Sequence, residues 1–146
     1  MSPQQLGLMI GGLLPALFYG VCGIFAKVST TAGMPVGPHL ICIGVAISLV
    51  GVGMQQVLPG PYPSAGAIAS SSMLGLLWGL GTGFVALGLI KYQVPLSKLV
   101  PLYNMNTLIT VMLALIVFLE WKSVDPVKLG IGALLVIVGG LLVSQA

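Results

Sequence analysis

Several polar side chains lie between Tyr103 and Thr110, inside the start of a long apolar run where polar groups are unexpected. On a helix, Asn104 and Thr107 share one face, while Tyr103, Asn106 and Thr110 share an adjacent one, so together they form a polar arc. An amide left unpaired in hydrocarbon is costly, so the arc must face other helices or a wet cavity. Interhelical packing and cavity lining therefore both remain open.

Two aromatic side chains favour the interpretation that the polar arc lines a cavity. Tyr19 and Trp78 lie well inside apolar runs, away from the interfacial belts where such rings usually sit. Aromatic walls with a few amides are typical of a small-molecule pocket. Pro15 predicts a kink in the same run as Tyr19, which frees a backbone carbonyl that a neighbour or a substrate could use. The predicted substrate-binding residues, which carry no charge and so favour a neutral or zwitterionic metabolite, are Tyr19, Trp78, Tyr103, Asn104, Asn106 and Thr107.

Acidic residues are confined to one charged segment. Glu120 and Asp125 are the only acids, and both fall at or beyond the end of an apolar run. We expect a structural role, in which they pair with Lys122 and Lys128 and Asp125 caps the next helix ahead of a proline.

His39 is the single histidine, placed at the entrance of an apolar run. Histidine titrates near neutral pH, which makes proton coupling conceivable, but a single interfacial histidine is usually just hydrated. No second ligand lies at a metal-binding spacing, and no G-x-S-x-G motif or catalytic triad can be assembled. We therefore expect neither a metal site, nor a cofactor, nor an enzyme.

Composition identifies the class of protein. Of 146 residues, 58% are hydrophobic and 5% charged, against roughly 25% charged in soluble domains. The five basic residues are scattered lysines, which disfavours a nucleic-acid partner. Cys22 and Cys42 lie in apolar runs, where a free thiol behaves as a small hydrophobe. The segment MSPQQ lacks a basic signal-peptide start, so the first run is expected to remain in the mature protein.

Apolar runs separated by Pro, Gly or charge predict an all-α membrane protein in which residues 1–146 form a single integral domain. Alternating segments typical of a β-barrel are absent from the sequence. Short loops favour antiparallel packing of consecutive helices. The predicted spans are residues 6–26, 40–58, 67–90, 99–119 and 127–143.

Small residues recur every four positions along two of these spans, which allows close approach of another backbone. The neighbour can belong to the same chain or to a second copy. The two stripes are Gly12, Ala16 and Gly20, and Gly75, Gly79 and Gly83.

The lysines give little orientation bias. With five spans, Lys122 and Lys128 lie on the N-terminal side, and Lys27, Lys91 and Lys98 lie on the other. The positive-inside rule then places the N-terminus outside, but so small an excess is also compatible with insertion in both orientations. Dual topology would permit an antiparallel homodimer, the two-chain equivalent of an inverted repeat.

Three stretches resemble the drug/metabolite transporter superfamily, whose common members have two EamA-like halves of five helices. LALIVFLEWKSVDPVKLGIGALLVIVGGLLV is similar to its apolar helix ending in an acid, here Glu120, followed by a glycine-punctuated last helix. LPALFYGVCGIFAK resembles its first helix, with Tyr19, Gly20 and Lys27 matching, and PLSKLVPLYN resembles the entry to its fourth.

The resemblance implies one half of a ten-helix transporter of small metabolites in the cytoplasmic (inner) membrane, acting as a homodimer or paired with another half. Four-helix small multidrug resistance relatives carry a glutamate in the first helix, and the first span here has no acid, which disfavours their drug/proton exchange. The alternative interpretation is a non-transporting membrane subunit or assembly factor whose glycine faces dock onto a larger complex.

Overall fold

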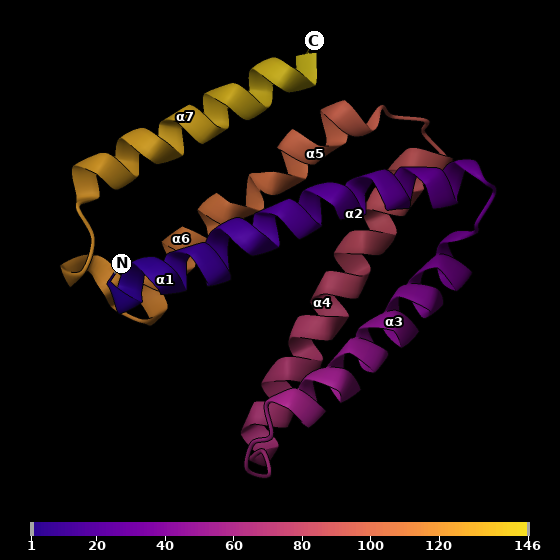
Figure 1. Ribbon diagram of the computed structural model, residues 1–146. Coiled ribbons are helices and arrows are strands. Elements are labelled where there is room, and N and C mark those ends of the chain that lie inside the picture. Colours follow the sequence, from indigo (N-terminus) through magenta and orange to yellow (C-terminus); the bar gives the residue numbers. More distant parts are fainter. Residues whose placement is uncertain (1, 146) are drawn as a thin grey trace. The chain divides into compact units, whose positions relative to one another are not determined.

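The computed structural model describes residues 2–145, and every regular element in that range is helical (Figure 1). The elements are α1 Pro3–Leu8, the π-helical η1 Met9–Leu13, α2 Leu14–Thr31, α3 Val36–Val57, α4 Ala65–Ile90, α5 Leu96–Asn104, α6 Asn106–Val117, the 3₁₀ turn η2 Glu120–Lys122, and α7 Pro126–Gln145.

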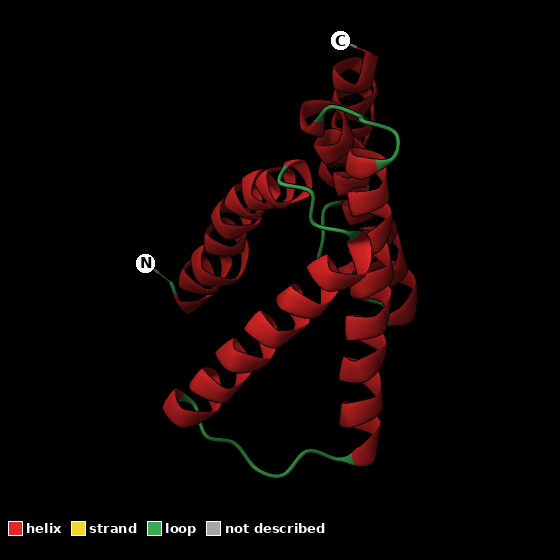
Figure 2. Ribbon diagram, turned by 90° about the vertical axis from the view of Figure 1, so that its right-hand side faces the viewer, coloured by secondary structure: helices red, strands yellow, loops and turns green. Residues whose placement is uncertain are grey.

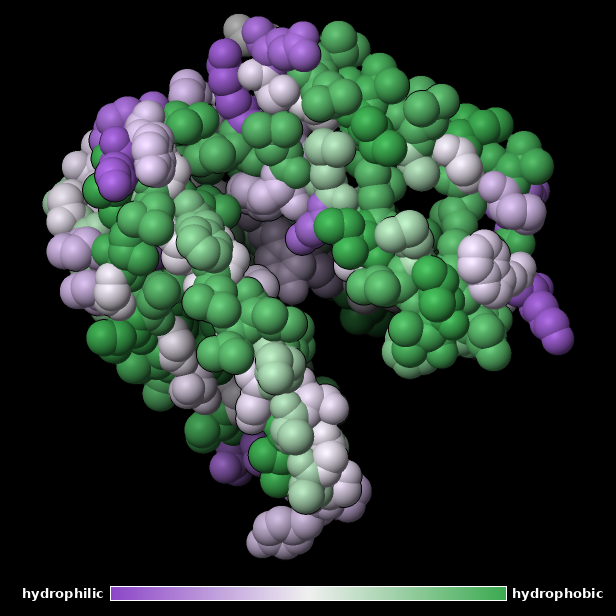
Figure 3. Space-filling view, turned by 180° about the vertical axis from the view of Figure 1, so that it is seen from behind, coloured by the Kyte–Doolittle hydropathy of each residue, from purple (hydrophilic) through white to green (hydrophobic). Residues whose placement is uncertain are grey.

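Five helices, each long and apolar enough to cross a bilayer, confirm the predicted all-α multi-pass membrane architecture. Apolar residues dominate the surface shown in Figure 3, as expected for helices that face lipid. The spans are Pro3–Thr31, Val36–Val57, Ala65–Ile90, Leu96–Val117 and Pro126–Gln145.

The ends of the first span extend beyond prediction because local hydrogen bonds continue the helix. Past Lys27, the Thr30 hydroxyl donates to the carbonyls of Ala26 (2.9 Å) and Lys27 (3.0 Å). Gly33, at φ +87°, ends the segment: its N–H donates to Thr30 O, and the next N–H, of Met34, donates to Ser29 O. This is a Schellman termination, in which a left-handed glycine lets late carbonyls be satisfied.

The chain divides into two compact units, Met1–Gln93 and Val94–Ala146. The prediction of a single integral domain stays a prediction.

In the first unit, α2, α3 and α4 contact one another, and the buried residues lie near the turn between α2 and α3. Thr30 and His39 flank this turn, and Ala86 and Leu89 are buried near the end of α4. A Cβ atom added to Gly83 would lie 3.3 Å from Leu40 Cδ1, so glycine permits the close α3–α4 approach there. Away from this contact, α3 and α4 diverge toward the loop that joins them (Figure 2).

In the second unit, α7 packs along α5 (Figure 1). Asp125 caps α7: its Oδ1 accepts from the N–H of Val127 (3.0 Å) and of Lys128 (3.2 Å), and its Oδ2 lies 3.4 Å from Lys128 Nζ. The predicted capping and pairing of Asp125 are confirmed. The predicted Glu120–Lys122 pair is wrong, since no such ion pair occurs within residues 2–145; instead the Glu120 carbonyl accepts from the Ser123 N–H and hydroxyl.

Candidate functional site

The fourth span is interrupted at Met105, in the middle of the polar arc. The Met105 N–H donates to Leu102 O at 3.2 Å, and the Leu108 N–H donates to Met105 O at 3.0 Å. Both bonds reach back three residues instead of four, so the α-helical ladder is broken between α5 and α6. One turn earlier, Pro101 has no N–H to donate to the carbonyl of Ser97, so the ladder of α5 lacks a second bond there.

The two amides flank this interruption. Asn104 is the last of the nine residues of α5 and Asn106 the first of α6. Because α5 begins at Leu96, three residues before the predicted start of the span, Asn104 lies about 12 Å along the helix instead of the expected 7 to 8 Å. The amides are therefore closer to the middle of the 22-residue span than the sequence predicted.

The side chains of Asn104 and Asn106 are both exposed. Between residues 2 and 145, no hydrogen bond involves either side-chain amide. An amide carries two donors and an acceptor, and near the middle of a bilayer these need water, a ligand or another protein surface.

The threonines behave differently from the amides. The Thr107 hydroxyl donates to Asn104 O at 2.9 Å, and the Thr110 hydroxyl donates to Asn106 O at 3.2 Å. Their polar groups are thus satisfied on their own helix, although Thr107 remains exposed. Tyr103 is 37% exposed. Within the arc, the amides are the groups most available for recognition.

The first span has its own irregularity, five residues of π-helix from Met9 to Leu13. The Leu14 N–H donates to Met9 O, five residues back, immediately before Pro15. A proline cannot donate to the carbonyl four residues earlier, and a π-bulge is one way to accommodate the lost bond. The π-helical segment therefore adjoins Pro15, and the kink predicted at this proline stays a prediction.

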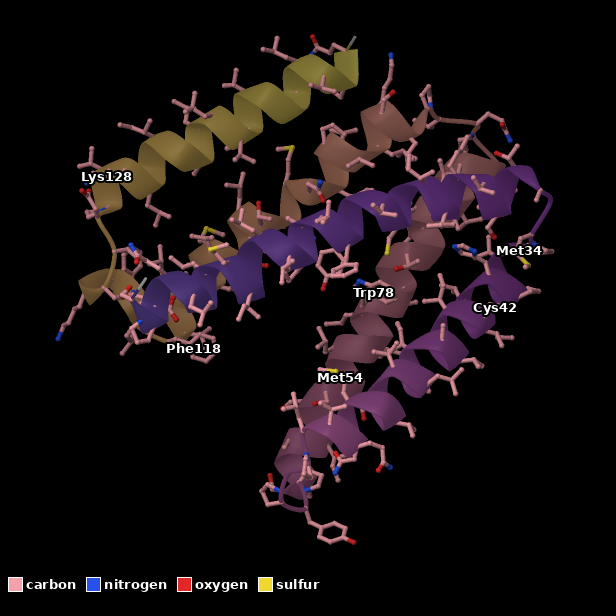
Figure 4. All side chains as sticks on the ribbon, in the orientation of Figure 1. Met34, Cys42, Met54, Trp78, Phe118 and Lys128 are labelled. Atoms are coloured by element: carbon pink, nitrogen blue, oxygen red, sulfur yellow. The ribbon has the colours of Figure 1, made fainter. Side chains whose placement is uncertain are left out.

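The two predicted aromatic residues lie in the first unit. Tyr19 on α2 is 70% exposed, so its ring is not used in a core. Trp78 on α4 (Figure 4) is 48% exposed and is likewise not used in a core. That these two rings line one pocket together with the amides stays a prediction.

The predicted glycine stripes differ in their surroundings. Gly83 contacts α3 as described, whereas a Cβ atom added to Gly12, Gly20, Gly75 or Gly79 meets nothing within 4 Å. Ala16, the sixth stripe residue, is exposed. Contacts at these five positions stay a prediction.

Sequence reasoning missed two relationships. His39 was expected to be hydrated, but it is only 6% exposed and its Nδ1 lies 3.1 Å from Ser29 Oγ, across the turn between α2 and α3. Gly140, outside both predicted stripes, is the closest-packed glycine of α7. Neither signal is visible in the sequence, because both depend on which helices come together.

Among residues 2–145, no group of three or more His, Cys, Asp or Glu side chains could hold a metal ion. Cys22 and Cys42 are free and exposed thiols.

Comparison with known proteins finds no match: no family model matches the chain, and neither does any curated protein or solved structure.

Proposed function

We propose that this chain is a half-size membrane transporter of a small neutral or zwitterionic metabolite, acting as a homodimer or as one of a pair of halves by alternating access. The observation that carries the proposal is the interruption at Met105 with an unpaired amide on each side. Discontinuous helices near mid-membrane form the substrate sites of many transporters, because their freed polar groups line an aqueous cavity.

The chemistry of the exposed groups favours the substrate class. Asn104 and Asn106 offer both donors and acceptors, which suits hydroxyl, amide, amino or carboxylate groups in a compact ligand. The described membrane-spanning helices contain no acid, so a strongly cationic substrate would lack a counter-charge. Tyr19 and Trp78 would supply apolar walls.

The low burial of the chain favours a second set of helices. Only three apolar side chains between residues 2 and 145 are buried, namely Ala86, Leu89 and Leu115. A polar cavity must be sealed from lipid by protein, and a partner bundle would supply the helices that complete it. This agrees with the ten-helix organisation that the EamA-like resemblance implies. The cytoplasmic membrane is the proposed location on the same grounds.

Cysteine accessibility in sealed vesicles tests the proposal. Cys22 and Cys42 are first replaced by Ala, and single cysteines are then introduced as Asn104→Cys, Asn106→Cys and, for comparison, Leu135→Cys. Leu135 is an exposed apolar residue near the middle of α7. We expect membrane-impermeant maleimide to label the cysteines at 104 and 106 but not the one at 135, because only a water-filled cavity admits the reagent to mid-membrane.

Uptake of a metabolite panel into proteoliposomes completes the test. Transport of one compound, with protection of the cysteine at 106 by that compound, is the expected result. Inert cysteines at 104 and 106 in both orientations would exclude transport through this site. That result would favour the alternative, a non-transporting subunit whose amides face a protein neighbour.

A further inference from the structure

A groove of about 250 Å³ runs between α6 and α7 in the second unit. Its walls are mostly apolar and include Leu108 and Val111 on α6, and Leu129, Ala133 and Val136 on α7. Two polar residues mark its ends. Lys128 lies at the start of α7, beside the loop (Figure 4), and Thr107 lies toward the middle of the fourth span.

The groove has the dimensions of one leaflet. Lys128 is the third residue of α7, and Val136 is eight residues further on, about 12 Å deeper along the helix. Half of a hydrocarbon core of about 30 Å is about 15 Å. A cation at the membrane surface above an apolar channel of this length complements an amphiphile with an anionic head and an acyl chain.

We propose that this groove binds one anionic phospholipid, with an acyl chain between α6 and α7 and the phosphate at the Lys128 ammonium. The inference is independent of transport, because it uses neither amide of the interrupted span. Basic residues at the surface ends of interhelical grooves are a recurrent means of holding anionic head groups.

The ion pair between Lys128 and Asp125 is compatible with this. The Lys128 side chain is 86% exposed, and its contact to Asp125 Oδ2 is 3.4 Å. Asp125 is held separately by the N–H groups of Val127 and Lys128. An ammonium has three donors, so Lys128 can contact a phosphate while Asp125 continues to cap the helix.

The groove volume suits a single acyl chain. At about 250 Å³ the groove is smaller than typical small-molecule sites, which measure roughly 300–1,000 Å³. Side chains of a second copy's helix could also enter it, and the oligomeric state measured below distinguishes that occupant from a lipid.

Native mass spectrometry of the purified full chain tests the site. The probes are phosphatidylglycerol and phosphatidylcholine with identical acyl chains. We expect one phosphatidylglycerol to bind at most about fivefold more tightly than phosphatidylcholine, the preference that one lysine at a lipid surface predicts, because the Asp125 carboxylate 3.4 Å from the ammonium offsets part of the attraction. Lys128→Gln should remove this preference and Lys128→Arg should keep it, whereas Lys122→Gln, in the segment before α7, should leave it unchanged.

Filling the groove tests the chain-binding part. Ala133→Leu should weaken both lipids at least fivefold, whereas Leu135→Phe, on an exposed position of the same helix, should not. If thermal unfolding shows that Ala133→Leu perturbs folding, Leu108→Ala is used in its place. This substitution widens the groove without overpacking it and should still alter the affinity for lipid. Equal affinity for the two lipids, or a preference that survives Lys128→Gln, would overturn the proposal. Loss of a dimer in Ala133→Leu would also overturn it, by showing that the groove seats a second copy.

Discussion

Gly140 of α7 lies directly against Met105, the residue at which the fourth span is interrupted. A Cβ atom added to Gly140 would lie 3.3 Å from Met105 Sδ and 3.4 Å from the Pro101 carbonyl oxygen. The Met105 N–H does not satisfy that carbonyl, because it donates to Leu102 O instead. The absence of a side chain at Gly140 therefore lets α7 cover the backbone where the helix is broken, and a Cα–H···O contact becomes available there.

Gly140→Ala should destabilise the protein by about 1 kcal/mol, because the added methyl group would lie 3.3 Å from Met105 Sδ and the Met105 side chain must shift, while the Pro101 carbonyl oxygen at 3.4 Å limits the room. Gly139→Ala is the matched control, since a Cβ atom there meets nothing within 4 Å. Unfolding of both variants in detergent, followed by circular dichroism, measures the difference. Equal stability of the two variants would show that the α5–α7 contact is not tight.

Asn106→Leu should reduce uptake of the identified substrate about tenfold while leaving the free energy of unfolding nearly unchanged. The amide has no hydrogen-bond partner within residues 2–145, so its removal leaves no partner unsatisfied in the described chain, and a lost ligand hydrogen bond costs about 1–1.5 kcal/mol. Thr110→Val, which removes a hydroxyl bonded to its own helix, is the control and should retain uptake. Dissociation of an oligomer by Asn106→Leu would instead assign the amide to a protein interface.

Ser29→Ala should destabilise the first unit by about 1 kcal/mol or more, because it leaves the buried His39 ring nitrogen without its partner 3.1 Å away. Ser48→Ala is the control, since Ser48 is exposed and bonds only to Gly44 O on its own helix. A double-mutant cycle with His39→Phe isolates the pair, and a coupling energy near zero would show that the bond contributes nothing.

The α3–α4 contact at Leu40 and Gly83 defines an antiparallel register between the two helices. This register allows a test of whether the α4 stripe, Gly75, Gly79 and Gly83, packs within one chain. In the structure α3 and α4 diverge beyond this contact (Figure 2), and a Cβ atom added to Gly44, Gly75 or Gly79 meets nothing within 4 Å. If the two helices closed on each other, counting four, eight and eleven residues along each would bring Gly44 to Gly79, Ser48 to Gly75, and Gly51 to Ser72. Small residues would then oppose small residues, a pattern that favours close packing.

If the stripe packs within one chain, the double variant Ser48→Cys/Gly75→Cys, made without Cys22 and Cys42, should form an intrachain disulfide in membranes. Val50→Cys/Leu74→Cys, at exposed positions on other faces, should not. Gel mobility separates the outcomes, because a product of twice the mass would place this stripe between two copies. A disulfide requires the two Cβ atoms to approach to about 4 Å, so its formation would report closure of α3 on α4.

Orientation can be tested at Tyr62, which is fully exposed in the loop between α3 and α4. With two lysines on its side of the membrane and three on the other, a cysteine at position 62 should be labelled from outside in more than half of the molecules. Lys98→Gln leaves two lysines on each side of the membrane and should move the fraction of molecules labelled from outside toward one half. Lys122→Gln leaves one lysine against three and should move that fraction toward one. Labelling unaffected by either change would show that lysine balance does not set the orientation.

The sequence by itself determined the number, type and approximate limits of the membrane spans, because a bilayer requires about 20 consecutive apolar residues and Pro, Gly and charge interrupt such runs. It also determined the Asp125 cap, which is a local matter of a carboxylate two and three residues before free N–H groups.

Only the tertiary structure decided that His39 is buried against Ser29, that Gly140 covers the interruption at Met105, and that Gly83 rather than its stripe neighbours is in contact. Composition specifies what a helix can tolerate in lipid. Which face meets which neighbour depends on close packing between particular side chains and on backbone hydrogen bonds broken at particular residues, and neither is periodic in the sequence.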